Sequence, residues 1–249
     1  MPTFVLVPGF WLGGWAWQRV AALLRTAGHD VYPVTLTGLG ERVHLSGPQV
    51  DLDTHITDIL NLVRFEDLHS IVLVGHSGAN LAITGVADRM PERIVRLVYV
   101  DAGPLPSGVA QIDFNPPEVQ ARYRRRVAEE GDGWRLPLPS WEELDQGATL
   151  DGLGEAERTL MRARATDQPF ATAVQALQLN NPAHEALPKT AIWCTSRSAQ
   201  AREMVARGLP LFSALAGPQW QFVDLPTGHW PMFSQPGNLA DLLAAVAQV

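Results

Sequence analysis

A serine between an apolar run and a helix-forming segment is the first residue of the chain with evident chemistry. Ser77 follows the run Ile71 to Val74 and lies in the pentapeptide GHSGA at positions 75–79. On a sharp strand-to-helix turn a serine hydroxyl projects beyond the sheet, and backbone N–H groups at the helix N-terminus favour negative charge nearby. The pentapeptide fits the pattern G-x-S-x-G except at its last position, where Ala79 keeps the side chain small. We therefore predict that Ser77 is a nucleophile.

A serine hydroxyl needs a base within hydrogen-bond reach, and His229 is the natural candidate. It follows the last expected strand, at 221–225, in a glycine-containing loop, which places it with Ser77 at the carboxyl edge of the sheet. The other histidines have no spacing typical of metal ligands, so we expect no metal ion and no cofactor. They are His29, His44, His55, His69, His76 and His184.

The acid that would orient His229 has several candidates. We favour Asp101, which comes directly after the expected strand at 96–100. Asp224, within the last strand, can instead serve as a local structural acceptor.

The loop after the expected strand at 191–194 is the other usual place for such an acid. It contains no carboxylate before Glu203, which is the reserve candidate. A third arrangement has no carboxylate at all, and Ser196 or Ser198 orients the histidine through a water molecule.

Two backbone N–H groups are needed to bind an oxyanion. We expect one from Gly78, after the nucleophile, and one from Phe10, in the glycine-containing loop after the first strand. Tryptophans next to these positions are more often core or interface residues than ligand platforms. We still expect one or two to line the substrate pocket, with Trp11 and Trp230 as the candidates.

Strands and helices alternate along most of the chain, which predicts an α/β fold with a mostly parallel, doubly wound sheet. The segment 103–189 differs, because prolines and charged helical patterns replace apolar strands. We expect a core formed by 1–102 and 190–249, with 103–189 inserted as a helical cap. The expected strands are 4–7, 31–36, 71–74, 96–100, 191–194 and 221–225, and the expected helices are 15–27, 53–63, about 79–88 and 239–246.

The composition of the chain bears on its binding partners, its disulfide bonds and its location. The 249 residues carry a net charge of −7, and the one basic cluster lies among acidic residues at 122–126, so nucleic acid is not an expected partner. A single cysteine, Cys194, excludes an internal disulfide framework and fits a buried structural thiol. The chain starts directly with a strand and has no run of 18 apolar residues, so we expect a cytoplasmic protein with no membrane association. The oligomeric state stays open, with a homodimer as one candidate.

The chain resembles the α/β-hydrolases, and more narrowly the plant methylesterase and hydroxynitrile lyase group with its bacterial esterase relatives. The resemblance is carried by FVLVPGFWLGGWAW at 4–17, TLTGLGERVHL at 35–45, LVGHS at 73–77, ITGVADRMPERIVRLVYVDA at 83–102 and TGHWPM at 227–232. It implies an α/β-hydrolase fold with Ser77 as nucleophile, His229 as base, and Phe10 and Gly78 as oxyanion donors. The chain departs from the group after the serine (Ala79 and Asn80), after Cys194 (Ser196 or Ser198 at the acid's position) and after the histidine (Trp230).

These observations favour a serine-dependent hydrolase that cleaves an ester or thioester of a small, largely apolar or aromatic substrate through an acyl-enzyme. The acyl group is free or attached to a carrier. An acyltransferase, cyclase or carbon–carbon lyase of secondary metabolism using the same serine and histidine is the alternative, because a missing acid would weaken water activation. A non-catalytic binding protein on the same scaffold is the third hypothesis.

Overall fold

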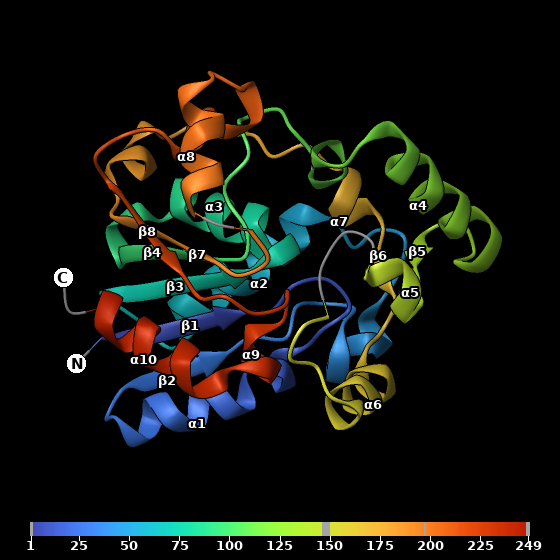
Figure 1. Cartoon of the computed structure of the whole chain (residues 1–249), viewed down its shortest axis with the longest axis horizontal. Coiled ribbons are helices and arrows are strands. Elements are labelled where there is room, and N and C mark those ends of the chain that lie inside the picture. Colours follow the sequence, from blue (N-terminus) through green and yellow to red (C-terminus); the bar gives the residue numbers. More distant parts are fainter. Residues whose placement is uncertain (1, 146–149, 197, 248–249) are drawn as a thin grey trace.

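A single parallel sheet organises the chain in the computed structural model, which describes residues 2–145, 150–196 and 198–247. The six strands are ordered β2-β1-β3-β4-β7-β8, and every neighbouring pair is parallel (Figure 1). The carboxyl ends of all six strands therefore lie at one edge of the sheet. The strand bounds are β1 Thr3–Val7, β2 Asp30–Pro33, β3 Ile71–His76, β4 Ile94–Val100, β7 Lys189–Trp193 and β8 Trp220–Asp224.

The central strands are largely apolar because both faces of the sheet are covered by helices. Alternate side chains of β3 show this directly. Val72 and Val74 pack with α1 (Gln18–Thr26) and α10 (Pro236–Val246), whereas Ile71 and Leu73 pack with α2 (Leu52–Phe65) and α3 (Asn80–Arg89). In Figure 1, α1 and α10 lie side by side along one face. The predicted α/β-hydrolase arrangement of a doubly wound parallel sheet is confirmed.

Between β4 and β7 the chain contributes mainly helices. The elements from α4 to α7 lie beyond the carboxyl edge of the sheet, whereas η6 (Pro182–Ala186) lies back against α3 (Figure 1). This part of the chain also contains one small antiparallel pair, β5 with β6, which the sequence did not indicate. We refer to residues 103–188 as the cap segment. Its elements are α4 Pro117–Glu130, β5 Arg135–Leu136, α5 Trp141–Leu144, α6 Glu155–Arg164, β6 Gln168–Pro169 and α7 Ala171–Val174.

Short helices fill several connections. The remaining α-helices are α8 Ser198–Ala206 and α9 Pro231–Ser234. The 3₁₀ helices are η1 Gly14–Trp17, η2 Gly40–Leu45, η3 Ser77–Ala79, η4 Pro91–Arg93, η5 Gln111–Phe114, η6 Pro182–Ala186 and η7 Pro210–Leu215.

The bounds of most expected elements differ by a few residues, and the second expected strand and the loop after β7 differ in ways that have a physical reason. The second strand was predicted to run to Leu36, but β2 ends at Pro33. Beyond it the chain turns toward η1, and the Thr35 hydroxyl accepts the Gly14 N–H at 2.8 Å, so these residues leave the sheet to hold a neighbouring loop. The loop expected after β7 is short, because α8 already begins at Ser198.

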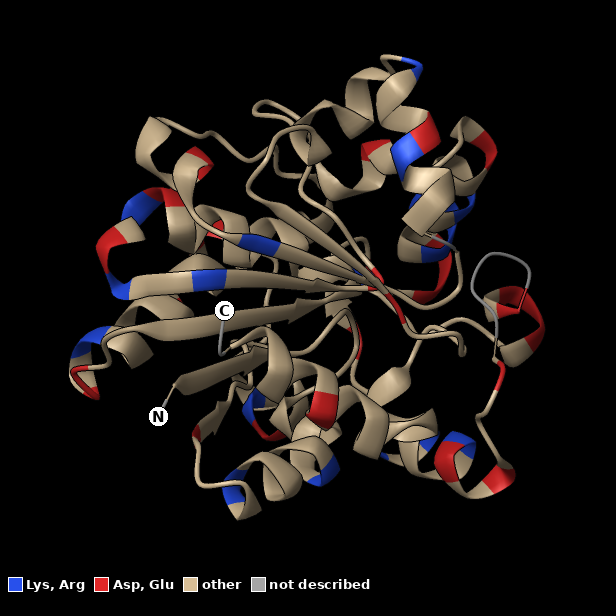
Figure 2. Cartoon of the chain, turned by 60° about the vertical axis from the view of Figure 1, so that its left-hand side comes forward, with Lys and Arg blue, Asp and Glu red and all other residues tan. Residues whose placement is uncertain are grey.

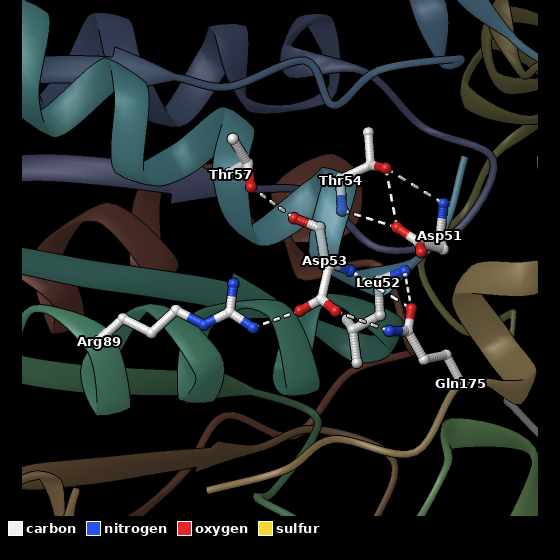
Figure 3. A network of polar contacts seen from close by, with 7 residues as sticks. All are labelled: Asp51, Leu52, Asp53, Thr54, Thr57, Arg89 and Gln175. Atoms are coloured by element: carbon white, nitrogen blue, oxygen red, sulfur yellow. Dashed lines mark hydrogen bonds and ion pairs between the residues drawn. The ribbon is translucent and has the colours of Figure 1, made fainter. Parts of the chain in front are cut away.

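The start of α2 is fixed by a reciprocal cap. Asp51 accepts the backbone N–H of Thr54 at 2.8 Å, and the Thr54 hydroxyl accepts the N–H of Asp51 at 3.4 Å (Figure 3). Gln175, which follows α7, binds the same helix start, so the cap segment is attached to the core there.

Charged residues lie chiefly on the outer helices and loops, whereas the strands carry few of them (Figure 2). Two basic residues are exceptions, Arg96 and Lys189, which are both buried in the sheet. Among the described residues no helix is long and apolar enough to cross a membrane.

Candidate active site

Ser77 is held on a strained turn at the end of the central strand β3. Its φ angle is +50°, a left-handed conformation that is uncommon for residues other than glycine. The serine starts η3, which continues directly into α3, so the hydroxyl leaves the sheet where the helix begins. Backbone strain of this kind is retained where the surrounding structure imposes it, often at functional sites.

The structure brings Ser77, His229 and Asp101 together in one chain of hydrogen bonds. The Ser77 Oγ atom lies 2.8 Å from Nε2 of His229, and Nδ1 of the same ring lies 2.6 Å from Oδ2 of Asp101. The Asp101 side chain is 4% exposed and that of His229 is 17% exposed. The ring therefore has one nitrogen facing the serine and the other facing a nearly buried carboxylate, as a base and its orienting acid require.

Four further contacts hold the Asp101 carboxylate in place. It accepts the N–H groups of Cys194 at 2.9 Å and Thr195 at 3.1 Å, and the Thr195 hydroxyl donates to it at 2.9 and 3.2 Å. Burial alone would raise the pKa of Asp101, but the hydrogen bonds and the charge of His229 outweigh burial and lower that pKa to about 2. Asp101 is therefore ionised at neutral pH.

The alternative acids lie elsewhere. Glu203 is exposed on α8, where it pairs with Arg207 at 3.8 Å. Asp224 accepts the backbone N–H of Ser198 at 2.7 Å and its hydroxyl at 3.0 Å, which matches the predicted role as a local structural acceptor. The position that a serine-bound water would take at Nδ1 of His229 is occupied by Asp101.

His76, at the end of β3 next to Ser77, is hydrogen-bonded to the loop that carries His229. Its Nε2 atom lies 2.7 Å from the backbone carbonyl oxygen of His229, so Nε2 carries the proton, since a carbonyl only accepts. Burial, followed by the nearby His229, lowers the pKa of His76 to about 3. His76 is thus a neutral, buried donor that holds the backbone of His229.

The loop after β1 lies directly against the serine turn. A Cβ atom added to Gly9 would lie 3.0 Å from the Ser77 Cβ, and one added to Gly78 would lie 2.5 Å from the Phe10 ring. Both glycines are thus required by close approach. A cavity of about 10 Å³ remains here, room for roughly one water molecule. Its lining includes Gly9, Phe10, Gly78, Ala79, Gln168 and Thr172.

The two tryptophans expected near the pocket are both buried. Trp230 packs edge-on against the His229 ring, with 5.0 Å between ring centroids. Trp11 lies beneath the cap segment, and its indole N–H donates to the carbonyl of Leu136 at 2.9 Å. Neither tryptophan lines the small cavity. Trp230 instead packs on the His229 ring, and Trp11 links the loop after β1 to the cap segment.

Cys194 is buried, as predicted, and burial raises the pKa of its thiol. In the described part of the chain, no group of three or more His, Cys, Asp and Glu residues is arranged to hold a metal ion.

Three residues of the site were not singled out from the sequence. The Thr195 hydroxyl could have been suspected, because Thr195 follows a strand adjacent to that of Asp101. The bond between His76 and the His229 backbone has no signal in the sequence, and neither has the contact of Gln168 with the loop after β1.

The fold and this site define a class of protein. The chain matches the alpha/beta hydrolase family over residues 4–242 and belongs to that family. It is an esterase-like enzyme with the α/β-hydrolase fold.

Comparison with known proteins identifies several similar esterases. It is 35% identical to the carbendazim hydrolyzing esterase of Nocardioides sp., over 99% of this chain and all of that protein. It is 28% identical to methylesterase 17 of Arabidopsis thaliana, over 43% of this chain and 40% of that one. An extracellular α/β-hydrolase from a Paenibacillus species superposes with a TM-score of 0.82 at 22% identity, with 99% of both chains covered. The expected resemblance to plant methylesterases and bacterial esterases is confirmed.

Proposed function

We propose that this protein is a serine-dependent hydrolase that cleaves small, largely apolar or aromatic esters through an acyl-enzyme. The observation that carries the proposal is the continuous hydrogen-bonded path from Ser77 through His229 to Asp101, at 2.8 and 2.6 Å. Such a path allows the serine proton to move to the imidazole as the hydroxyl attacks a carbonyl carbon.

The reaction would proceed in two halves. In the first, Ser77 Oγ attacks the ester carbonyl while His229 Nε2 takes its proton and then delivers that proton to the leaving alcohol. In the second, His229 removes a proton from water, the hydroxide attacks the acyl-enzyme, and Ser77 recovers its proton as the acid departs. The ionised Asp101 stabilises the imidazolium in both halves and keeps Nδ1 protonated.

The negative oxygen of each tetrahedral intermediate needs donors that are in place before the reaction. We assign this role to the backbone N–H groups of Phe10 and Gly78. Support comes from the tight packing of the Phe10 ring on Gly78, which holds the two backbone segments together next to Ser77.

The substrate class is inferred from the relatives. The relative with 35% identity over the full chain is named for hydrolysing carbendazim, an aromatic methyl carbamate, and others are named as methylesterases. We therefore propose aromatic methyl esters and methyl carbamates as substrates of this chain. The alternative of acyl transfer, cyclisation or carbon–carbon cleavage was motivated by a missing acid together with an apolar cap. The distance of 2.6 Å between Asp101 and His229 supports hydrolysis over that alternative.

The test is the hydrolysis of 4-nitrophenyl acetate, methyl benzoate and carbendazim by the wild type and by Ser77→Ala. We expect turnover of at least one of them by the wild type and a loss of several orders of magnitude in kcat in the variant. Full activity of Ser77→Ala would disprove the proposal.

A further inference from the structure

The loop after β1 is bound to the cap segment through the backbone and side chain of one residue, Trp11. Its N–H donates to Oε1 of Gln168 at 3.1 Å, and its carbonyl accepts the N–H of Thr166 at 2.9 Å. The indole N–H donates to the carbonyl of Leu136. The φ angle of Trp11 is +66°, so these contacts hold the residue in a conformation that it would not adopt freely.

Gln168 is the only side chain among these partners, and its amide has one defined orientation. The Thr172 hydroxyl donates to the carbonyl of Pro169 at 2.6 Å, so it must accept from Gln168 Nε2 at 2.8 Å. The Gln168 oxygen therefore points to Trp11. Gln168 as a whole residue is 1% exposed, and a buried amide with both ends satisfied is a rigid support.

The hydrogen bond from Trp11 acts on its neighbour Phe10. The N–H of Trp11 belongs to the peptide group that joins Phe10 to Trp11, so fixing it restricts rotation of the backbone at Phe10. Gln168 and Thr172 also line the small cavity together with Phe10 and Gly78. The Gln168 amide thus lies immediately behind the backbone to which we assign the oxyanion donors.

We propose that Gln168 is a positioning residue, through which the cap segment sets the direction of the Phe10 N–H toward the oxyanion. This inference rests on the proposed function. The hydrogen bonds of Gln168 go to Trp11 and Thr172 rather than to Ser77 or His229, so it acts through the Phe10–Trp11 peptide group. Loss of its acceptor would leave the loop free to turn, and misaligned donors bind the transition state less well than aligned ones.

A second glutamine of the cap segment provides a matched control. Gln175 accepts the backbone N–H of Leu52 at 2.7 Å, and its amide nitrogen donates to Asp53 at 2.9 Å, where Arg89 also pairs (Figure 3). It therefore also links the cap segment to a backbone N–H group of the core, at the start of α2 rather than beside Ser77.

The experiment compares Gln168→Met with Gln175→Met, using 4-nitrophenyl acetate for kinetics and trifluoroacetophenone as an inhibitor. The serine hydroxyl adds reversibly to the inhibitor's ketone and gives a hemiketal with a negative oxygen. The Ki of the inhibitor therefore depends on the donors that bind this oxyanion. Active sites are counted with a fluorophosphonate, so that unfolded protein does not lower the apparent kcat.

For Gln168→Met we expect kcat to fall about ten- to hundredfold, with KM within about twofold of the wild type and a parallel rise in the Ki of the ketone. Gln175→Met keeps kcat and Ki within about twofold. Thr172→Val, which removes the partner of the Gln168 amide nitrogen, lowers kcat in the same direction by a smaller factor and decides the matter if Gln168→Met does not fold.

If Gln168→Met leaves kcat per active site and the Ki of the ketone unchanged, the positioning role is wrong. The same holds for Thr172→Val if Gln168→Met does not fold. An effect of Gln175→Met as large as that of Gln168→Met would also overturn the role. Failure of the proposed function would show differently, as undiminished hydrolysis by Ser77→Ala. In that case, backbone hydrogen exchange still tests the hydrogen bond between Trp11 and Gln168. Loss of the Gln168 oxygen is expected to speed hydrogen exchange at the backbone N–H of Trp11.

Discussion

Asp101 and His229 are 128 positions apart in the chain, yet Oδ2 of the first lies 2.6 Å from Nδ1 of the second. Parallel strands explain this proximity. Asp101 directly follows β4, and His229 lies in the loop after β8, so both residues occupy the carboxyl edge of the sheet, where β3 also ends at Ser77. Cys194 and Thr195 directly follow the intervening strand β7, and their backbone N–H groups donate to the Asp101 carboxylate.

Replacing Asp101 by Asn tests the orienting acid. Asparagine keeps the shape but removes the charge that stabilises imidazolium and the acceptor that selects the tautomer, so we expect kcat to fall roughly 10³- to 10⁴-fold at pH 7. Glu203→Gln is the control, because Glu203 is exposed and pairs with Arg207. Steady-state kinetics on 4-nitrophenyl acetate measure both, and a larger loss in the Glu203 variant would contradict the assignment.

The buried neutral His76 predicts a stability that declines in acid. Its pKa is lowered to about 3 in the folded state from an ordinary 6.5, so between these values the unfolded chain binds a proton that the folded chain does not. The free energy of unfolding therefore falls as pH falls below 6.5, by up to about 1.4 kcal/mol per pH unit from this group. Urea denaturation at pH 7 and pH 5 measures it. His76→Asn should lose less stability over that interval, and an identical loss in both proteins would refute the role.

The thiol of Cys194 should be inert in the folded enzyme. Burial, with the charge of Asp101, raises its pKa, and the thiolate is the reactive form. We expect negligible reaction with Ellman's reagent at pH 8 until denaturant is added, and near wild-type kcat in Cys194→Ala. Rapid labelling of the native protein accompanied by loss of activity would show that the thiol is accessible.

Close approach at Gly9 predicts a strong effect from a single methyl group. A Cβ there would lie 2.8 Å from His76 Nδ1 and 3.0 Å from the His76 carbonyl oxygen, so the backbone beside Ser77 must move. Gly9→Ala should lower both kcat and the free energy of unfolding, the latter by about 1–3 kcal/mol. Gly237→Ala, where a Cβ meets nothing within 4 Å, should stay within about 0.5 kcal/mol of the wild type in thermal and urea unfolding. Equal effects of the two substitutions would contradict the packing argument.

The fold could be predicted from the sequence because its buried parallel strands are short apolar runs that alternate with helical patterns and turn residues, such as Pro8 and Gly9 after β1. The same regularity pointed to Ser77, Asp101 and His229, since each lies just beyond a strand and parallel strands end together. The residues at which strands end could not all be predicted. The observed end of β2 at Pro33 depends on the Thr35 contact with Gly14, which is not local in the sequence.

The contacts that hold the site in place could not be predicted in the same way. Gln168 and Trp11 are 157 positions apart, and Gln168 lies in a two-residue strand of the cap segment without a repeating pattern. The hydrogen bond between His76 and the carbonyl of His229 could not be predicted, because nothing in the sequence shows that these two residues meet. Such contacts depend on how the loops and the cap segment pack on the sheet.

The most direct measurement for the central claim is the mass of the enzyme during turnover. Intact-protein mass spectrometry after rapid acid quench, with 4-nitrophenyl acetate as substrate, should show a protein about 42 Da heavier, because an acetyl group replaces the hydroxyl hydrogen of one serine. Peptide mapping should place the acetyl group on Ser77, and the adduct should be absent in Ser77→Ala. Hydrolysis that continues without an adduct at any quench time, or an adduct on another residue that persists in Ser77→Ala, would contradict the account.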